Sequence, residues 1–424
     1  MVLRLCENIR AFTGRMPQKR QIPAASITGG RHSVTLYEIH PFIELLPQNE
    51  QQRLLLAATG DWKRSGLYKE GRKVLCGDYS VENYPLLGGR EVRQIRLKGA
   101  LPRLQNRNVV RRYKGLGYVD KWLIPMGECR LGTKRADNNI QFFHPDGSMR
   151  KRTLEREVLS ALQLGGQITD VVLGFGLYDD LVFDGDQVGF VVYGLEVSNI
   201  NRVSDAFDHI LFSNRREEFM LHLVDLTENS GRMLARVHRE HKLSHSYAYP
   251  MNYRRFLNGE VRLLDLDTMQ TLKGYSPEEI AVRLFIDLNR AAWDHYRIDN
   301  CWFSGIPEEH WLLFNNRAPF LAHWLKGYFD EYPGLYFTGL INAFLSKNPR
   351  SKWSGSPANM AAYEEIFGCF PEQNMRRTDH VSSLVEPARQ LIYNPNVSEV
   401  NLAECKDRIF KPFFDALLHV AAAI

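Results

Sequence analysis

Hydrophobic and polar residues alternate in short runs between residues 72 and 192, with the period of two that is typical of β-strands. The runs cover residues 73–76, 92–97, 109–113, 118–124 and 188–193. One segment breaks this pattern, because over residues 149–164 apolar residues such as Leu154 and Val158 recur at helical spacing. This part of the chain is therefore predicted to be strand-rich, with one amphipathic helix among the strands.

After Tyr193 the apolar residues recur with the helical period instead. Residues 216–241 predict a long amphipathic helix. Ser276-Pro277, with two glutamates in the following turn, is a typical helix start and predicts a helix over residues 277–296. Further helices are predicted over residues 319–345, 358–367, 380–393 and 402–422.

The first 70 residues are harder to assign. Residues 14–35 are basic and rich in Gly, Ser and Thr, which predicts an extended arm or loop, and residues 38–58 carry a helical pattern. We therefore expect an α+β, bilobal protein with three parts. These are an N-terminal extension (1–70), a strand-rich N-lobe (71–193) and a mostly helical C-lobe with a C-terminal helical extension (194–424).

Composition narrows the class of protein. The 424 residues are 44% hydrophobic and 24% charged, as in soluble globular proteins, and no apolar window of about 18 uncharged residues predicts a membrane span. The N-terminus lacks the apolar core of a signal peptide. Six scattered cysteines without a CxxC pair predict reduced thiols and a cytoplasmic location. The formal charge of +5 permits an acidic small-molecule partner but does not predict binding to nucleic acid.

Lys98 lies near the end of the strand predicted over residues 92–97, where a lysine can reach phosphate groups as a mobile charge. On the helix over residues 149–164, Glu157 lies at the edge of the apolar face, where it could pair with this lysine, and Glu155 is the competing choice. The alternatives are a solvated edge-strand lysine and a surface helix with i,i+4 ion pairs.

A third motif begins at His245, with Asn252 seven positions later and Asp265 at the end of a following apolar strand. Amide and carboxylate oxygens are the hard ligands that Mg²⁺ prefers. The alternative is a turn followed by a β-hairpin around Asn258-Gly259, and this hairpin is expected under both interpretations. His238, His241 and His245 lack the spacing of a zinc site. Two lone GxG pairs, at residues 115–117 and 174–176, are weak phosphate-loop signals.

These motifs resemble the selenoprotein O family of kinase-like AMP transferases over residues 74–270. The matching features are residues 97–102 (LKGALP), Asp146-Gly147 followed by Arg152, Arg156 and Glu157, the loop at residues 84–90 with Gly88 and Gly89, the spacing from His245 to Asn252, and Asp265. The segment from Leu234 to His245 and the ending Asp265-Leu-Asp267 are similar to the aminoglycoside phosphotransferases.

The resemblance implies a protein-kinase-like fold that uses ATP with Mg²⁺ or Mn²⁺, and it implies a role for each matching residue. The catalytic set would be Lys98, Glu157, His245 (which orients its loop) and Asp267; the nucleotide contacts Lys98, Arg152, Arg156, Gly88 and Gly89; and the metal ligands Asn252 and Asp265.

The chain departs from these families at two positions and by one insertion. Tyr247 stands where protein kinases and aminoglycoside phosphotransferases carry the catalytic aspartate, and Met251 stands where selenoprotein O relatives carry an aspartate. Roughly thirty extra residues lie between Lys98 and Asp146, and Asp267 could replace the missing base. We expect either a nucleotidyl or phosphoryl transferase acting on a protein or small molecule, or a nucleotide-binding pseudokinase that serves as a scaffold or regulator.

Overall fold

The computed structural model divides the chain into two compact units, the first comprising Met1–Asn199 with Asp265–Thr268 and the second Ile200–Leu264 with Met269–Ile424. The described residues are 2–66, 68–70, 73–76, 92, 94–100, 149–183, 186–196, 202–203, 206, 216–245, 248, 250–256, 259–281, 283–284, 287–288, 291, 320–332 and 411–424. The strands predicted over residues 109–113 and 118–124 and the helices predicted over 358–367 and 380–393 lie outside them.

The first unit contains an antiparallel sheet of eight strands in the order β1-β2-β7-β8-β5-β4-β3, with β6 also paired to β8. The strands are β1 (Gln18–Ile22), β2 (Val34–Glu38), β3 (Tyr68–Glu70), β4 (Lys73–Cys76), β5 (Gln94–Lys98), β6 (Met149–Arg150), β7 (Val171–Phe183) and β8 (Asp186–Leu195). The expected strands at residues 73–76, 92–97 and 188–193 correspond to β4, β5 and part of β8.

The N-terminal 70 residues contribute the strands β1, β2 and β3 to this sheet and belong to the first unit, not to a separate extension. The expected arm over residues 14–35 is replaced by β1 and the start of β2, and β2 pairs with β7. The strand β1 escaped the pattern analysis because it lies at the sheet edge, where four of its five residues are polar and only Ile22 is buried. The boundary expected at residue 70 therefore falls inside the first unit.

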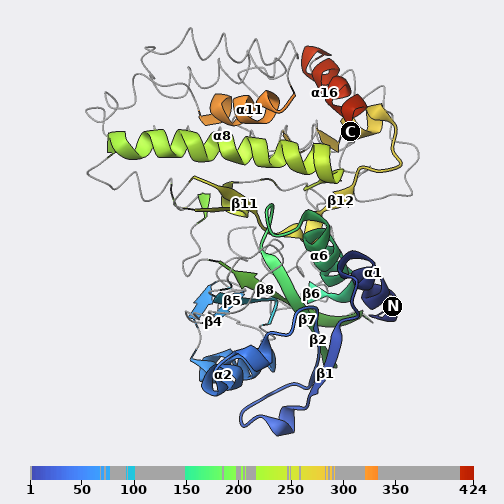
Figure 1. The fold of residues 1–424 in the computed structure, drawn as a ribbon, viewed down its shortest axis with the longest axis vertical. Coiled ribbons are helices and arrows are strands. Elements are labelled where there is room, and N and C mark those ends of the chain that lie inside the picture. The colour runs from blue at the N-terminus through green and yellow to red at the C-terminus, as the bar shows by residue number, and fades with distance from the viewer. Residues whose placement is uncertain are drawn as a thin grey trace, which may run out of the picture. The chain divides into compact units, whose positions relative to one another are not determined.

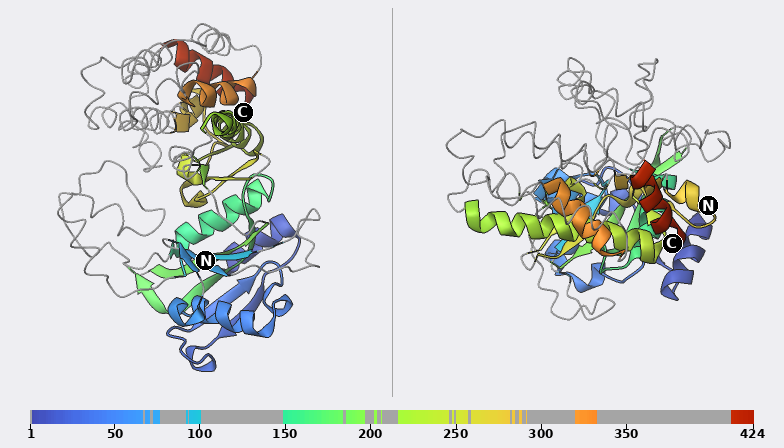
Figure 2. Two further views of the ribbon diagram at one scale, coloured as in Figure 1. Left: turned by 90° about the vertical axis from the view of Figure 1, so that its left-hand side faces the viewer. Right: turned by 90° about the horizontal axis from the view of Figure 1, so that it is seen from above.

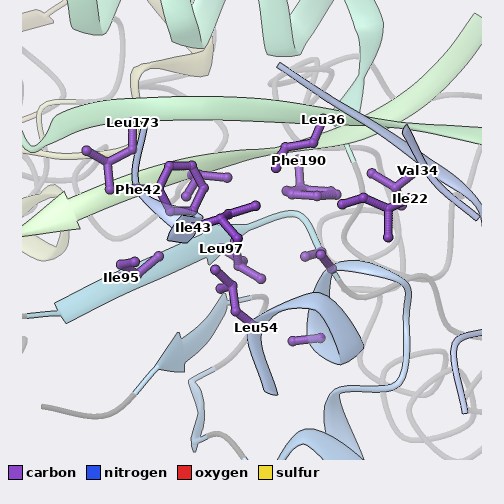
Figure 3. Close-up of a cluster of buried hydrophobic side chains, with 14 of the residues drawn as sticks. Ile22, Val34, Leu36, Phe42, Ile43, Leu54, Ile95, Leu97, Leu173 and Phe190 are labelled. Carbon is purple, nitrogen blue, oxygen red and sulfur yellow. The ribbon is translucent and has the colours of Figure 1, made fainter. Parts of the chain in front are cut away.

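The two faces of the sheet are covered by different helices (Figures 1 and 2): α2 (Gln48–Ala58) lies on one face, and α1 (Val2–Thr13) and α6 (Lys151–Leu164) lie on the other. The α2 face is an apolar core in which Leu54 packs with Ile95 and Leu97 of β5 (Figure 3). Because side chains alternate along a strand, Arg96 and Lys98 of β5 point to the α6 face. The sequence of β5 thus fills the core with one set of side chains and presents charges to α6 with the other.

The described residues of the second unit are mostly helical. The longest helix among them, α8 (Arg216–His241), has the bounds predicted from the sequence. The helix α11 (Phe320–Asp330) lies within a predicted helix, and α16 (Lys411–Ala423) ends one residue beyond the helix predicted over residues 402–422. Pro277 begins another helix, whose start is fixed by a capping box: the N–H of Ser276 donates to Glu279, and the N–H of Glu279 donates to the Ser276 hydroxyl.

Two short antiparallel pairs complete the second unit, β10 (Tyr253–Arg255) with β11 (Val261–Leu263) and β9 (Leu243–Ser244) with β12 (Gln270–Thr271). The expected hairpin is present as β10–β11, with Gly259 at a φ of 83° in its turn. The predicted α+β plan, a strand-rich part followed by a helical part, is thus confirmed. Among the described residues, no helix is long and apolar enough to cross a membrane.

Candidate functional site

Lys98 and Glu157 form an ion pair inside the first unit. The Nζ of Lys98 lies 2.7 Å from Oε1 of Glu157, and both side chains are essentially fully buried. Lys98 is the last residue of β5, and Glu157 is in the second turn of α6, on the face that packs against β7 and β8. The structure therefore pairs this lysine with Glu157, the first choice from the sequence.

Asp265 is the second acidic partner of Lys98. Its Oδ1 lies 3.1 Å from the lysine Nζ, and its side chain is 23% exposed. The backbone of Asp265 has a φ of 56°, in the left-handed region that aspartate tolerates better than most residues and that is enriched at functional sites. This conformation follows the strand β11 directly and turns the chain into the 3₁₀ helix η5 (Leu266–Thr268).

The turn η5 is fastened to α6. Arg156 donates from its guanidinium to the backbone carbonyl of Asp267 over 3.1 Å, and Asp267 itself is buried. Arg156 was expected to contact a nucleotide phosphate. In the structure it fastens the segment that carries Asp265 and Asp267, and its contact with a phosphate stays a prediction. Arg152 of the same helix is exposed.

The charges in this cluster act strongly on one another. Burial lowers the pKa of Lys98, but the carboxylates of Glu157, Asp265 and Asp267 outweigh that effect and raise its pKa above the usual value. Burial also raises the pKa of Glu157, more than the lysine lowers it, and the nearby charge of Asp267 adds to this. We assign the pair as ammonium and carboxylate, because the lysine faces three carboxylates and Glu157 accepts from two donors.

The second of these donors is Tyr193, which in the sequence is only the last residue of the strand predicted over residues 188–193. Its hydroxyl donates a hydrogen bond to Oε1 of Glu157, and its ring centroid lies 4.7 Å from the guanidinium carbon of Arg96. Arg96 in turn forms a buried ion pair of 2.9 Å with Asp170. Nothing in the sequence pattern distinguishes Tyr193 from other apolar strand residues, because its role depends on its neighbour across the sheet.

His245 belongs to the second unit and is fully buried there. Its Nε2 lies 2.8 Å from the carbonyl oxygen of Leu264, and its backbone N–H donates to Oδ2 of Asp287 over 2.7 Å. His238 also contacts Asp287 (2.8 Å) and places its other ring nitrogen 2.7 Å from the hydroxyl of Tyr328. His245 is therefore held in a structural network, and Asp287, which the sequence analysis missed, connects its two histidines.

Of the remaining residues that the sequence singles out, the structure describes Asn252. Asn252 is buried in the second unit, where its backbone carbonyl accepts from the N–H of Leu264. Its binding of a metal together with Asp265 stays a prediction. Gly88, Gly89 and Tyr247 lie outside the described residues.

The second GxG pair is a packing feature. Gly174 and Gly176 lie within β7, and a Cβ atom at Gly176 would lie 2.2 Å from the ring of Phe190 on β8. The absence of a side chain therefore permits close packing between the two strands, and this pair does not belong to a loop that could cover a phosphate.

The carboxylate oxygens around Lys98 are of the kind that binds a divalent cation. One lysine and three carboxylates give the cluster a formal charge of −2, and Oε2 of Glu157 is buried without a hydrogen-bond partner in the described part of the chain. Carboxylate oxygens are the ligands that Mg²⁺ and Mn²⁺ prefer. No ready-made group of three or more metal-binding side chains is present among the residues that the structure describes, so Asp265 and Asp267 would require other ligands to complete a metal site.

No protein-family model matches the chain, and no curated protein matches it significantly. Among solved structures, the chain is similar to a rhoptry kinase from Toxoplasma gondii (12% identity, 88% of this chain and 86% of that chain covered, TM-score 0.30). It is also similar to ROP2 from Toxoplasma gondii, described as a virulence factor with a protein-kinase fold and no enzymatic activity (10% identity, 92% of each chain, TM-score 0.28). TM-scores this low establish neither a shared fold nor a shared activity.

Proposed function

We propose that this protein has a protein-kinase-like fold and is an ATP- and Mg²⁺-dependent transferase, which moves a phosphoryl or nucleotidyl group to a protein or small molecule. The observation that carries the proposal is the buried cluster of Lys98, Glu157 and Asp265, with contacts of 2.7 and 3.1 Å. A lysine that is held by a helix glutamate beside a following aspartate is suited to neutralise phosphate charge, and group transfer of this kind depends mainly on positioning and charge.

Each residue of the cluster has a separate task in this proposal. Lys98 would bind phosphate oxygens, Glu157 would hold its ammonium group in place, and Asp265 would hold a divalent cation. The cation, when bound, would neutralise charge on the phosphates. Asp267 lies close enough to influence the pKa values of both Lys98 and Glu157, and it is the candidate for the missing base.

A second candidate function is favoured by the residues at the two expected base positions. Tyr247 and Met251 cannot readily accept a proton at neutral pH. Loss of a general base typically costs about 10²–10⁴-fold in rate. A protein with the Lys98 cluster but no transfer activity would be a nucleotide-binding pseudokinase that acts as a scaffold or regulator.

One experiment separates these possibilities. The purified chain is incubated with Mg²⁺ or Mn²⁺ and with ATP labelled at the γ- or the α-phosphate, and ATP binding is measured in parallel by calorimetry. Label from γ-phosphate indicates phosphoryl transfer, and label from α-phosphate indicates nucleotidyl transfer. Binding without incorporation supports the scaffold, whereas no binding at millimolar ATP overturns both functions. Asp265→Asn is the matched variant, because it keeps the side-chain size but should remove the dependence of ATP binding on the metal.

A further inference from the structure

The lysine-binding glutamate is itself held by a second set of buried residues on the α6 face of the sheet. Tyr193 on β8 donates its hydroxyl to the same oxygen of Glu157 that contacts Lys98. Tyr193 is 1% exposed, so this hydrogen bond is shielded from bulk water. The Glu157 carboxylate of α6 is thereby bound to two neighbouring strands, to β5 through Lys98 and to β8 through Tyr193.

The ring of Tyr193 is in turn held in place by Arg96, which contacts one of its faces. Arg96 is two residues before Lys98 on β5, so both side chains point to the same face, and β5 pairs with β8 in a register that places Arg96 opposite Tyr193. The guanidinium carbon of Arg96 lies 4.7 Å from the ring centroid, within the range of a cation–π contact. The ion pair between Arg96 and Asp170 fixes the guanidinium in turn.

We propose that Tyr193 is a positioning residue that holds Glu157 toward Lys98, so that the lysine is ready for the phosphates of a nucleotide before the nucleotide binds. This inference rests on the proposed function of the Lys98 cluster. Preorganised charges strengthen binding because less ordering is needed when the ligand arrives. Without the tyrosine hydroxyl, Lys98 is the one donor left to Glu157 among the residues that the structure describes, where Oε2 already has no hydrogen-bond partner.

The burial of the ion pair between Lys98 and Glu157 explains why the second hydrogen-bond donor to Glu157 should be neutral. Burial raises the pKa of Tyr193 well above its usual value, and the adjacent Glu157 carboxylate raises it further, so the hydroxyl stays protonated and acts as a donor. A second cation at this position would neutralise Glu157 and weaken its hold on the lysine. A tyrosine supplies the hydrogen bond without competing as a charge.

The test compares Tyr193→Phe with Tyr178→Phe. Both tyrosines are buried in neighbouring strands of the same sheet, but the hydroxyl of Tyr178 has no hydrogen-bond partner among the described residues, so its removal controls for the loss of a buried hydroxyl alone. Affinities are measured for Mg²⁺·ATP and for adenosine. Because adenosine lacks the phosphates that Lys98 would contact, Tyr193→Phe should weaken ATP binding by roughly tenfold or more and change adenosine affinity less than about twofold. Equal losses for both ligands, or no loss for either, would overturn the proposal.

A second measurement does not depend on the nucleotide. In protein labelled with ¹⁵N-lysine, the Nζ signal of Lys98, assigned by its loss in Lys98→Arg, reports how firmly the ammonium group is held. We expect a sharp, slowly exchanging signal in the wild type and in Tyr178→Phe, and a broadened or rapidly exchanging one in Tyr193→Phe. An unchanged signal in Tyr193→Phe would refute the positioning role. A changed signal in a protein that binds no ATP would keep the positioning role and refute the proposed function.

Discussion

Replacing Lys98 by methionine tests the buried ion pair directly. The side chains of Lys98 and Glu157 are 0% and 1% exposed, so the substitution leaves a carboxylate in the interior without its cation. Removing one member of a buried ion pair typically costs about 3–5 kcal/mol in unfolding free energy. We expect a value toward the upper end, because Oε2 of Glu157 has no hydrogen-bond partner within the described ranges and the charge of Asp267 opposes a carboxylate there.

The double variant Lys98→Met/Glu157→Leu separates a charge effect from a packing effect. Replacing both members of a buried pair by apolar residues of similar size is often neutral or stabilising. We therefore expect the double variant to recover most of the stability that Lys98→Met loses. Neither variant should bind ATP, because both lack the lysine that would contact the phosphates. Stability is measured by urea unfolding, followed by tryptophan fluorescence and far-UV circular dichroism to detect separate transitions of the two units.

The loss in Lys98→Met should also depend on pH. Without the lysine, burial raises the pKa of Glu157 in the folded protein further above its value in the unfolded chain. A carboxyl group of this kind is tolerated when protonated and destabilises the fold as pH rises through the folded pKa. The difference in unfolding free energy between wild type and variant should therefore be larger at pH 8 than at pH 5.

The control is Lys19→Met, which removes an exposed lysine from the edge strand β1 and should change stability by less than about 0.5 kcal/mol. A loss of under about 1 kcal/mol in Lys98→Met would contradict the buried pair. A double variant as unstable as the single one would contradict the electrostatic reasoning, because the cost would then arise from packing.

Three further predictions concern the second unit. Gly231→Ala should destabilise the contact of α8 with α11 by about 1–3 kcal/mol in urea unfolding, since its Cβ would lie 2.1 Å from the carbonyl oxygen of Trp324. Its control, Gly14→Ala in the first unit, meets no atom within 4 Å and should cost only about 1 kcal/mol of backbone strain. Glu228 is largely buried, which alone would raise its pKa, but a histidine and a lysine of α11 lower it to about 2. Its stabilisation is thus complete above the usual value of 4.5 and is lost as pH falls through about 2, so the stability deficit of Glu228→Gln at pH 6 should shrink in acid. Asp287→Asn should weaken the hydrogen bond from the His245 N–H and increase amide exchange there, and unchanged protection would contradict the network.

The elements of the fold that depend on residues close together in the chain could be predicted from the sequence alone. The helix α8 and the capping box at Ser276 follow from periodicity and side-chain type, because each depends on residues within a few positions of one another. The pairing of Lys98 with Glu157 was predicted from the resemblance to kinase-like proteins, because the strand and helix patterns place each residue at the edge of a buried face but do not show that the two meet. The resemblance to known motifs supplied their order along the chain.

Tertiary structure decided whatever depends on neighbours that are distant in sequence. The strand β1 has no apolar pattern and becomes a strand only because β2 offers it hydrogen bonds. Tyr193 looks like any buried strand residue until the register of β5 and β8 sets it over Arg96 and the packing of α6 brings Glu157 to its hydroxyl. The charge balance around Lys98 is decided in the same way, because its carboxylates come from a helix and a turn that are 59 or more positions away. Local pattern fixes which residues can be buried, but only packing decides which charges meet there.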